Sequence, residues 1–389
     1  MNLNQNSQAT SVFDTHFDHT AEDRRHLTSA SDRRLAEPNW ILDDSIPAPI
    51  RVLQLATGRW VAHLVGVAAE LGLADLVKSG PKTAEQLANA AGLHAPSLYR
   101  LLRALASVGV FTKQEDGCFA QTPMSDALRS DVSYSMRGLA RMVNRPWTIG
   151  AWTNLEHSVR TGVSAFEEAY GTSIFDYLTQ HTVEMQILAQ AMSSFSAQIG
   201  AAVADAYDFS EIRTLADIGG SHGMVLALIL ASNPAMRGIL FDLPGVIEGS
   251  SDFLKSRGIH HRIDLKSGNF FESVPEGADA YLLKHVLHDW SDENCVRILK
   301  NIHAVAKPAT KLLLVEFILN ESNKPQFAKI TDLEMLVISS YGRERTRVEW
   351  ENLLRASGFQ LTRTIRTKSG VSVIEAVRDQ IQWADQATR

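Results

Sequence analysis

The second half of the chain alternates short runs rich in β-branched residues with helical segments, and this alternation limits the possible folds more than any other feature. Beyond Arg213 the runs are, in order, RTLADIG, GILFDLP, IDLKSGNFF, ADAYLLKHV, KLLLVEFIL, FQLTRTIRT and VSVIEAV. Strands that alternate with helices predict an α/β fold, in which helices wrap a parallel sheet. No helical segment of comparable length separates the last two runs, so we expect these two strands to pair antiparallel.

The first half of the chain is predicted to be helical and to include a winged-helix pattern. Thr83 is a predicted N-cap, Gly92 a turn, and Pro96 a first-turn residue that opens a second amphipathic helix. Two short strand-like runs then flank Asp116 and Gly117, which together are a strong hairpin signal. The hairpin would be the wing, and more helical segments follow it as far as Tyr207.

These patterns divide the chain into five segments. The first is polar and has no apolar period, which is typical of a flexible tail. The predicted segments are an N-terminal tail (1–44), a winged-helix-like domain (45–130), a helical linker (131–208), a Rossmann-like α/β domain (209–380) and a C-terminal tail (381–389).

Composition argues against several classes of function. A formal net charge of −6 gives the chain no overall positive field for nucleic acid or anionic membrane. Its two cysteines, Cys118 and Cys295, lie far apart, so neither a disulfide framework nor a zinc site is indicated. The longest apolar run, MVLALILA, is far shorter than a membrane span. We therefore expect a cytoplasmic protein with no nucleic-acid and no membrane partner.

A glycine turn after the first predicted strand marks the expected ligand site. Gly219, Gly220 and Gly223 let a ligand lie against bare backbone. Asp217 stands just before the turn, where its carboxylate would repel a pyrophosphate and attract a cation. Asp242 ends the next strand, at the distance where an acidic side chain meets ribose hydroxyls. A positively charged nucleoside without phosphate, such as S-adenosylmethionine, fits these residues.

Other polar residues follow the later strands, at the same predicted edge of the sheet. His288 comes just past an apolar strand, where an imidazole can accept a proton near neutral pH. Glu316 at the end of the next strand and Glu344 in YGRERTRVEW could orient that imidazole. Glu344 could equally belong to a helix start with exposed charges. For His285, a structural role is favoured.

Five motifs together carry a family resemblance: DIGGSHG, FDLPGV, KHVLHDWSDENC, LLLVEFIL and GRERTRVEWENLLRASGF, in this order behind the winged-helix segment. From about Pro49 to Val377 the chain resembles the plant-type and bacterial class I O-methyltransferases, which include caffeate and hydroxyindole O-methyltransferases. The resemblance implies that segment 45–130 is a dimerisation domain that forms a homodimer, that the linker 131–208 contributes to the acceptor pocket, and that 209–380 is a catalytic domain with a Rossmann-like class I methyltransferase sheet. It also implies S-adenosylmethionine as methyl donor, with S-adenosylhomocysteine as product, and a small aromatic hydroxyl compound as acceptor.

The resemblance also implies residue roles, beside those indicated by the residues themselves. His288 would be the catalytic base, flanked by Glu316 and Glu344. The expected cofactor contacts are Asp217, Gly219, Gly220, Gly223, Asp242, Leu243, Asn269, Phe270 and Lys284. The expected acceptor contacts are Met192, Asp289, Met335, Ser339 and Trp147, of which core packing explains Met192, Met335 and Trp147 almost as well. No metal is expected, because no cluster with chelating spacing is evident.

Two departures and two alternatives remain. The family usually has a glycine at the position of Ser221 and an aspartate at that of Asn269, which puts cofactor affinity in doubt. One alternative is a winged-helix DNA-binding regulator, but the wing contains Glu115 and Asp116, which repel phosphate. The other is an enzyme of the same fold that methylates nitrogen or carbon. The identity of the acceptor cannot be read from the sequence.

Overall fold

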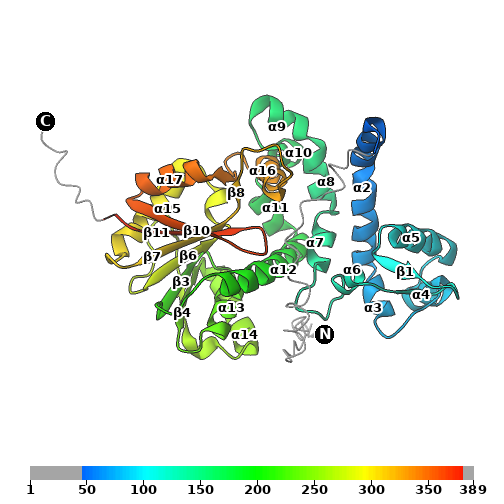
Figure 1. Ribbon diagram of the computed structural model, residues 1–389, viewed down its shortest axis with the longest axis horizontal. Coiled ribbons are helices and arrows are strands. Elements are labelled where there is room, and N and C mark those ends of the chain that lie inside the picture. The colour runs from blue at the N-terminus through cyan, green and yellow to red at the C-terminus, as the bar shows by residue number, and fades with distance from the viewer. Residues whose placement is uncertain (1–45, 380–389) are drawn as a thin grey trace, which may run out of the picture.

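The computed structural model describes residues 46–379 and has the shape of two lobes joined by helices (Figure 1). The predicted tails, 1–44 and 381–389, lie outside the described residues. One lobe contains the central sheet, and the other contains the first helices and a small hairpin. Helix α7 (Arg137–Met142) lies between them, against α2 (Ala48–Glu70) of the N-terminal lobe and α12 (Thr182–Ala206) of the sheet lobe (Figure 1).

The central sheet has seven strands in the order β10-β11-β7-β6-β3-β4-β5. The five strands from β3 to β7 pair parallel, whereas β11 pairs antiparallel with both β10 and β7. This sheet confirms the predicted α/β fold and the antiparallel closing pair. The strands are β3 (Thr214–Ile218), β4 (Arg237–Asp242), β5 (Ile263–Ser267), β6 (Ala280–Lys284), β7 (Lys311–Glu316), β10 (Phe359–Arg366) and β11 (Ser372–Arg378).

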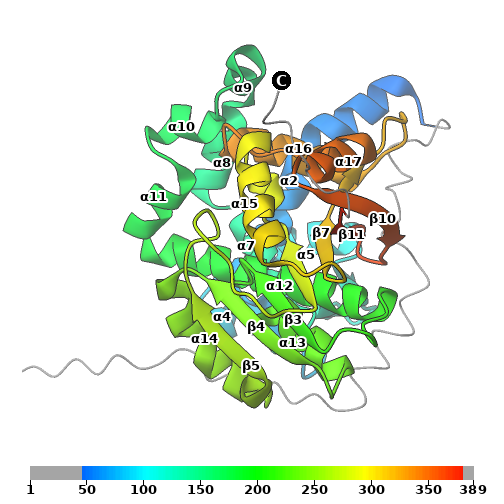
Figure 2. The same ribbon diagram turned by 90° about the vertical axis from the view of Figure 1, so that its left-hand side faces the viewer.

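Both faces of this sheet are covered, which is why its inner strands are nearly continuous apolar runs. In β6, Leu282 packs into the core beneath one face, whereas Tyr281 and Leu283 pack into the core of the other. Helices α12, α13 and α14 lie on the first face, and α15 and α17 lie on the second (Figures 1 and 2). The helices and short elements of this lobe are α13 (Met224–Ser232), α14 (Pro244–Ser256), η2 (His260–Arg262), η3 (Leu287–Asp289), α15 (Asp292–Val305), β8 (Ile318–Leu319), α16 (Phe327–Ile338), β9 (Arg345–Thr346) and α17 (Arg347–Ala356).

The N-terminal lobe has the predicted helix-turn-helix and wing. Thr83 closes a capping box with Gln86, Gly92 ends its helix at φ +66°, and Gly117 turns the hairpin at φ +83°. Strands β1 (Phe111–Lys113) and β2 (Phe119–Gln121) pair antiparallel. The helices of this lobe are α2 (Ala48–Glu70), α3 (Leu73–Val77), α4 (Ala84–Ala91), α5 (Ala95–Ser107) and α6 (Pro123–Asp126).

The middle of the chain is helical, as expected, and it packs around a core of its own. This core includes the aromatic side chains Trp147 and Phe166, and Val337 of α16 joins it from the sheet lobe. The middle helices are α7 (Arg137–Met142), α8 (Pro146–Thr153), α9 (Leu155–Thr161), α10 (Ala165–Tyr170), α11 (Ile174–Gln180) and α12 (Thr182–Ala206). They bring α8, α10 and α16 together above the sheet (Figure 1).

Two described helices, α2 and α12, are long and apolar enough to span a membrane by length and composition. Their mean hydropathies over 18 residues are 1.2 and 1.3, so the longest unbroken apolar run understates how apolar these helices are. The core helices of soluble proteins pass the same test. In this protein α12 packs against α7 and α13.

Candidate active site

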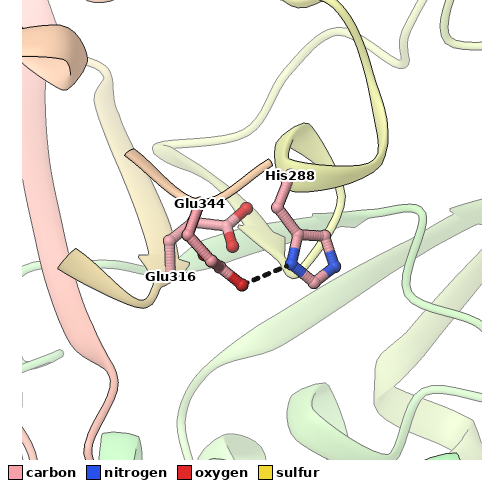
Figure 3. A group of neighbouring side chains, drawn as sticks. All are labelled: His288, Glu316 and Glu344. Atoms are coloured by element: carbon pink, nitrogen blue, oxygen red, sulfur yellow. Dashed lines mark hydrogen bonds and ion pairs between the residues drawn. The ribbon is translucent and has the colours of Figure 1, made fainter. Parts of the chain in front are cut away.

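The three residues predicted for proton transfer meet at the edge of the sheet (Figure 3). His288 lies in η3, just after β6, and its Nδ1 is 3.0 Å from Oε1 of Glu344. Glu316 ends β7, and its Oε1 accepts a hydrogen bond of 3.2 Å from the backbone N–H of Leu287. All three side chains are buried. Because Glu344 accepts at Nδ1, the other ring nitrogen of His288 is left to exchange a proton.

Burial and charge act on His288 in opposite directions. Burial by itself lowers the pKa of the imidazole, but the carboxylates of Asp289, Glu316 and Glu344 raise it to about 9. Oδ1 of Asp289 lies 3.5 Å from Nε2 of the same ring. Burial also raises the pKa of the Glu316 carboxyl, and the nearby Glu344 carboxylate adds to that rise. Protonation of the imidazole and protonation of the neighbouring carboxyls are therefore linked.

The turn that carries His288 is held from both sides by the chain around Glu344. The guanidinium of Arg345 is fully buried and donates to the carbonyl oxygens of Leu287 at 3.0 Å and Trp290 at 2.9 Å. The backbone N–H of Arg343 donates to the carbonyl oxygen of His288 at 2.8 Å. The turn is therefore fixed at its first residue, at His288 and just past its last residue.

The glycine turn after β3 packs so closely against its neighbours that side chains do not fit at two of its positions. A side chain at Gly219 would begin 2.9 Å from Val286, and one at Gly220 would begin 2.6 Å from the carboxyl carbon of Asp217. Asp217 itself is buried, and its Oδ2 has no hydrogen-bond partner within the described chain. Burial raises the pKa of this carboxyl to about 7, against the pull of Lys284. An unpartnered buried carboxyl beside bare backbone fits a cationic nucleoside.

Asp242 and its neighbours form the next part of this edge. The Asp242 carboxylate accepts from the backbone N–H of Ser221 at 2.8 Å and of Leu243 at 2.7 Å. Ser221 holds a left-handed backbone conformation, φ +53°, which explains why glycine is usual at this position. Gly223 begins α13 at φ +82°, and the Leu243 side chain is exposed beside the turn. The edge can therefore hold a ribose without a third glycine at Ser221.

Three more predicted cofactor residues flank the same turn. Phe270 lies against Gly219, 3.7 Å from the position of a Cβ there. Lys284 ends β6 and donates from Nζ to Oγ of Ser196 on α12 at 3.0 Å. Asn269 uses its Oδ1 to accept from the backbone N–H of Phe271 at 3.0 Å. That hydrogen bond leaves the Asn269 oxygen only partly free for an adenine amino group, which agrees with the departure noted in the sequence.

The predicted acceptor residues are placed less uniformly. Met335 on α16 packs beside Gly342, whose Cβ position lies 3.1 Å from the His288 carbonyl oxygen. Ser339 accepts from the backbone N–H of Gly342 at 3.2 Å, so its hydroxyl stabilises the same bend. Met192 on α12 is 39% exposed. Trp147 instead lies in the middle core and donates from Nε1 to Glu184 at 3.0 Å, which is a packing role.

The fold also creates a cluster that the sequence spacing did not reveal. Ligand atoms of His288, Glu316 and Glu344 lie within 4.8 Å of one another. The spacing in the sequence shows no chelating cluster, but the fold brings these three possible ligands together. A protonated His288 between Glu316 and Glu344 balances their negative charge as a bound cation would. The hydrogen bond between His288 and Glu344 already pairs the ring with one of these carboxylates.

Sequence reasoning missed three residues that the structure places around this site. Arg345 holds η3 through its hydrogen bonds to two backbone carbonyls. Asp332 accepts a hydrogen bond from the backbone N–H of Glu344 at 2.8 Å, and Glu334 accepts one from the indole N–H of Trp152. Of these, only Arg345 had a signal, since it follows Glu344 directly in the chain. The other two lie on α16, where helical periodicity does not distinguish a carboxylate that holds a neighbour from one in water.

Comparison with known proteins agrees with this geometry. The chain matches the O-methyltransferase domain over residues 152–360 and the O-methyltransferase dimerisation domain over residues 53–131. It is 43% identical to a phenazine O-methyltransferase from Lysobacter antibioticus, over 85% of this chain and 97% of that one. It is 40% identical to a mitomycin biosynthesis 6-O-methyltransferase from Streptomyces lavendulae, over 84% of this chain and 94% of that one.

Similarity to solved structures extends over both lobes. The structure superposes on that of LaPhzM with a TM-score of 0.80 at 43% identity, covering 86% of this chain and all of the other. This confirms the class I methyltransferase fold that the motifs implied, together with an N-terminal dimerisation domain. The chain belongs to the S-adenosylmethionine-dependent O-methyltransferase family.

Proposed function

We propose that this enzyme methylates a hydroxyl group of a small aromatic acceptor, with His288 as the general base. The observation that carries the proposal is the buried imidazole of His288, hydrogen-bonded at 3.0 Å to Glu344 and lying beside Glu316 at the end of a parallel sheet. The two relatives named above act on phenazine and mitomycin compounds, which supports an aromatic acceptor. The alternative role in DNA binding has no comparable support.

The methyl donor would lie along the glycine turn. Gly219 and Gly220 would supply the bare backbone, Asp217 would hold the positively charged group, and Asp242 would bind the ribose hydroxyls. The phenyl ring of Phe270 offers an apolar face beside the turn, next to Asn269. When bound there, S-adenosylmethionine supplies a methyl group on a positively charged sulfur.

The residues in and around η3 carry out the proton transfer. Glu344 fixes the ring of His288 through Nδ1, so Nε2 takes the proton from the acceptor hydroxyl and holds it. Asp289 and Glu316 stabilise the imidazolium that results. Glu316 also anchors the backbone of Leu287, so it fixes where the ring stands. Positioning of the acceptor oxygen can contribute on the order of 7 to 11 kcal/mol, which exceeds what proton removal provides.

We also propose that the working enzyme is a homodimer in the cytoplasm. The matched dimerisation domain supports the dimer, and the exposed apolar side chains of α2 offer a contact surface. Both cysteines are free, and Cys295 is buried, which is consistent with a reducing compartment.

Incubation with S-adenosylmethionine and a panel of phenols and heteroaromatic alcohols tests this function, with S-adenosylhomocysteine as the measured product. The His288→Ala variant should lower turnover about 10²- to 10⁴-fold. Its affinity for S-adenosylmethionine, measured by calorimetry, should stay within about twofold, because His288 does not contact the glycine turn in our assignment. Glu344→Gln should lower turnover less. Unchanged turnover of His288→Ala on a true acceptor would remove His288 from its role.

A further inference from the structure

Two tryptophans of α8 donate to two glutamates, and the pairs differ only in what surrounds them. Trp147 donates from Nε1 to Glu184 on α12 at 3.0 Å. Trp152 donates from Nε1 to Glu334 on α16. Each pair joins α8 to a neighbouring helix, and each carboxylate is removed in part from water. The two carboxylates differ in whether a positively charged side chain pairs with them.

Glu184 has such a partner. The guanidinium of Arg145 donates to both of its carboxylate oxygens, and this ion pair lowers the pKa of the carboxyl. Glu334 forms no ion pair with any residue between 46 and 379, and burial raises the pKa of its carboxyl. A partly buried carboxylate with one neutral donor is costly unless something else satisfies it.

Glu334 lies on a stripe of α16 that begins beside a series of aromatic rings next to the base. On α16 it lies seven residues after Phe327, which is two helical turns along the same stripe. The ring of Phe327 meets that of Phe317 at 5.8 Å, and Phe317 stacks on His285 at 5.2 Å. His285 in turn stacks on His288 at 4.9 Å. A continuous series of rings therefore leads from the stripe that carries Glu334 to the catalytic imidazole.

The surroundings of this ring series suit an aromatic ligand. Phe327 is 56% exposed, although it is a large apolar side chain next to the active site. His285 packs between Phe195, Phe317 and His288 with a left-handed backbone, and its buried Nε2 atom has no hydrogen-bond partner within the described residues. These features provide apolar contact area with few competing polar groups, and Glu334 adds one acceptor at its far end.

We propose that Glu334, oriented by Trp152, is a subsite that selects acceptors carrying a hydrogen-bond donor, an amino or hydroxyl group, at the end of the ring system remote from the methylated hydroxyl. This proposal rests on the proposed function, because it assumes that the aromatic acceptor lies between His288 and α16. Glu334 acts by binding, and it takes no part in proton transfer. An acceptor without the donor would leave the carboxylate without its second partner.

The matched probes 5-amino-1-naphthol and 1-naphthol test the subsite, with binding measured by calorimetry in the presence of S-adenosylhomocysteine. The unmodified enzyme should bind the amino compound about 10- to 100-fold more tightly, as expected for a hydrogen bond to a charged group. Glu334→Gln should reduce this preference to about twofold or less and leave the affinity for 1-naphthol unchanged. Glu184→Gln is the matched control and should keep the preference, since Glu184 is already paired with Arg145.

Thermal unfolding and turnover separate the possible outcomes. Glu334→Gln should unfold at the same or a higher temperature than the unmodified enzyme, whereas a purely structural carboxylate would give a lower one. Equal affinities for the two probes, or no binding of the amino compound, would overturn the subsite. If binding shows the preference but neither probe is methylated, the assigned methyl transfer to such acceptors fails and the subsite stands. If both probes are methylated with equal efficiency, the subsite fails and the proposed methyl transfer stands.

Discussion

His288 is buried among carboxylates, so its ability to act as a base depends strongly on pH. Burial lowers the pKa of the ring, and Asp289, Glu316 and Glu344 more than compensate for it, which raises the pKa to about 9. The ring takes up a proton from the acceptor only after it has lost its own. In the free enzyme at neutral pH most molecules therefore carry the proton on His288 already.

We accordingly expect kcat/KM to rise with pH from 7 toward 9, because the fraction of neutral His288 rises over that range. Glu344→Gln removes one of the carboxylates that hold the proton, so the midpoint of the rise should move to lower pH while the maximal rate falls. Rate measurements with one acceptor across this range provide the test. Since both proteins use the same acceptor, ionisation of its own hydroxyl affects the two profiles equally. Identical midpoints would contradict the charge assignment.

Among the elements, the short turn η3 is the one whose position matters most for the reaction. Its ends are held by a single side chain, because Arg345 donates to the carbonyl oxygens of Leu287 and Trp290. The same guanidinium pairs with Asp292 at 2.7 Å and lies over the ring of Trp350. Lysine cannot reach these acceptors together, since only the planar fork of arginine presents several N–H groups in fixed directions.

Arg345→Lys should therefore lower kcat about 10- to 100-fold, while the dissociation constant of S-adenosylmethionine changes little. The effect follows from a small displacement of His288, which lies between the two clamped carbonyls. Arg343→Lys is the control, because the Arg343 side chain binds Asp292 and Glu349 and reaches the turn only through its backbone. Steady-state kinetics and calorimetry on both variants measure the difference. If kcat falls equally in the two variants, Arg345 contributes only to the overall stability of the fold.

At the scale of the whole molecule, α2 leaves much of its apolar surface uncovered. Its buried residues are confined to its last turns, at Gly66, Ala68 and Ala69. Large apolar side chains such as Leu53 and Trp60 are more than half exposed. An apolar face of this size on a helix of 23 residues marks a contact surface, and it falls largely inside the matched dimerisation domain.

Replacing both Leu53 and Trp60 by Asp should convert the enzyme from a dimer to a monomer at micromolar concentration, because two charges would be buried in the contact. Light scattering after size-exclusion chromatography measures the mass. Glu85→Gln, on the exposed side of α4, is a control that should leave the mass unchanged. A doubly substituted protein that keeps the dimer mass would show that α2 does not form the contact.

Much of this organisation could be predicted from the sequence, for identifiable reasons. The strands β3, β4, β6 and β7 are nearly continuous apolar runs, and the rule that polar residues gather past strand ends brought Glu316 to His288. The pairing of Glu334 with Trp152 joins residues 182 positions apart and depends on how α16 lies across α8. No local pattern records such a crossing, so the subsite emerged only from the folded chain.

Helix α16 supports the catalytic pair and also carries the proposed subsite, which matters for redesign of the enzyme. One side of it holds the backbone of Glu344 through Asp332, and the roughly opposite side carries Glu334. Remodelling this helix to admit new compounds would also loosen the support of the catalytic pair. Changes in α16 that admit a wider range of acceptors are therefore expected to lower the turnover rate as well. Libraries of variants in α8, with Asp332 kept intact, offer the better starting point.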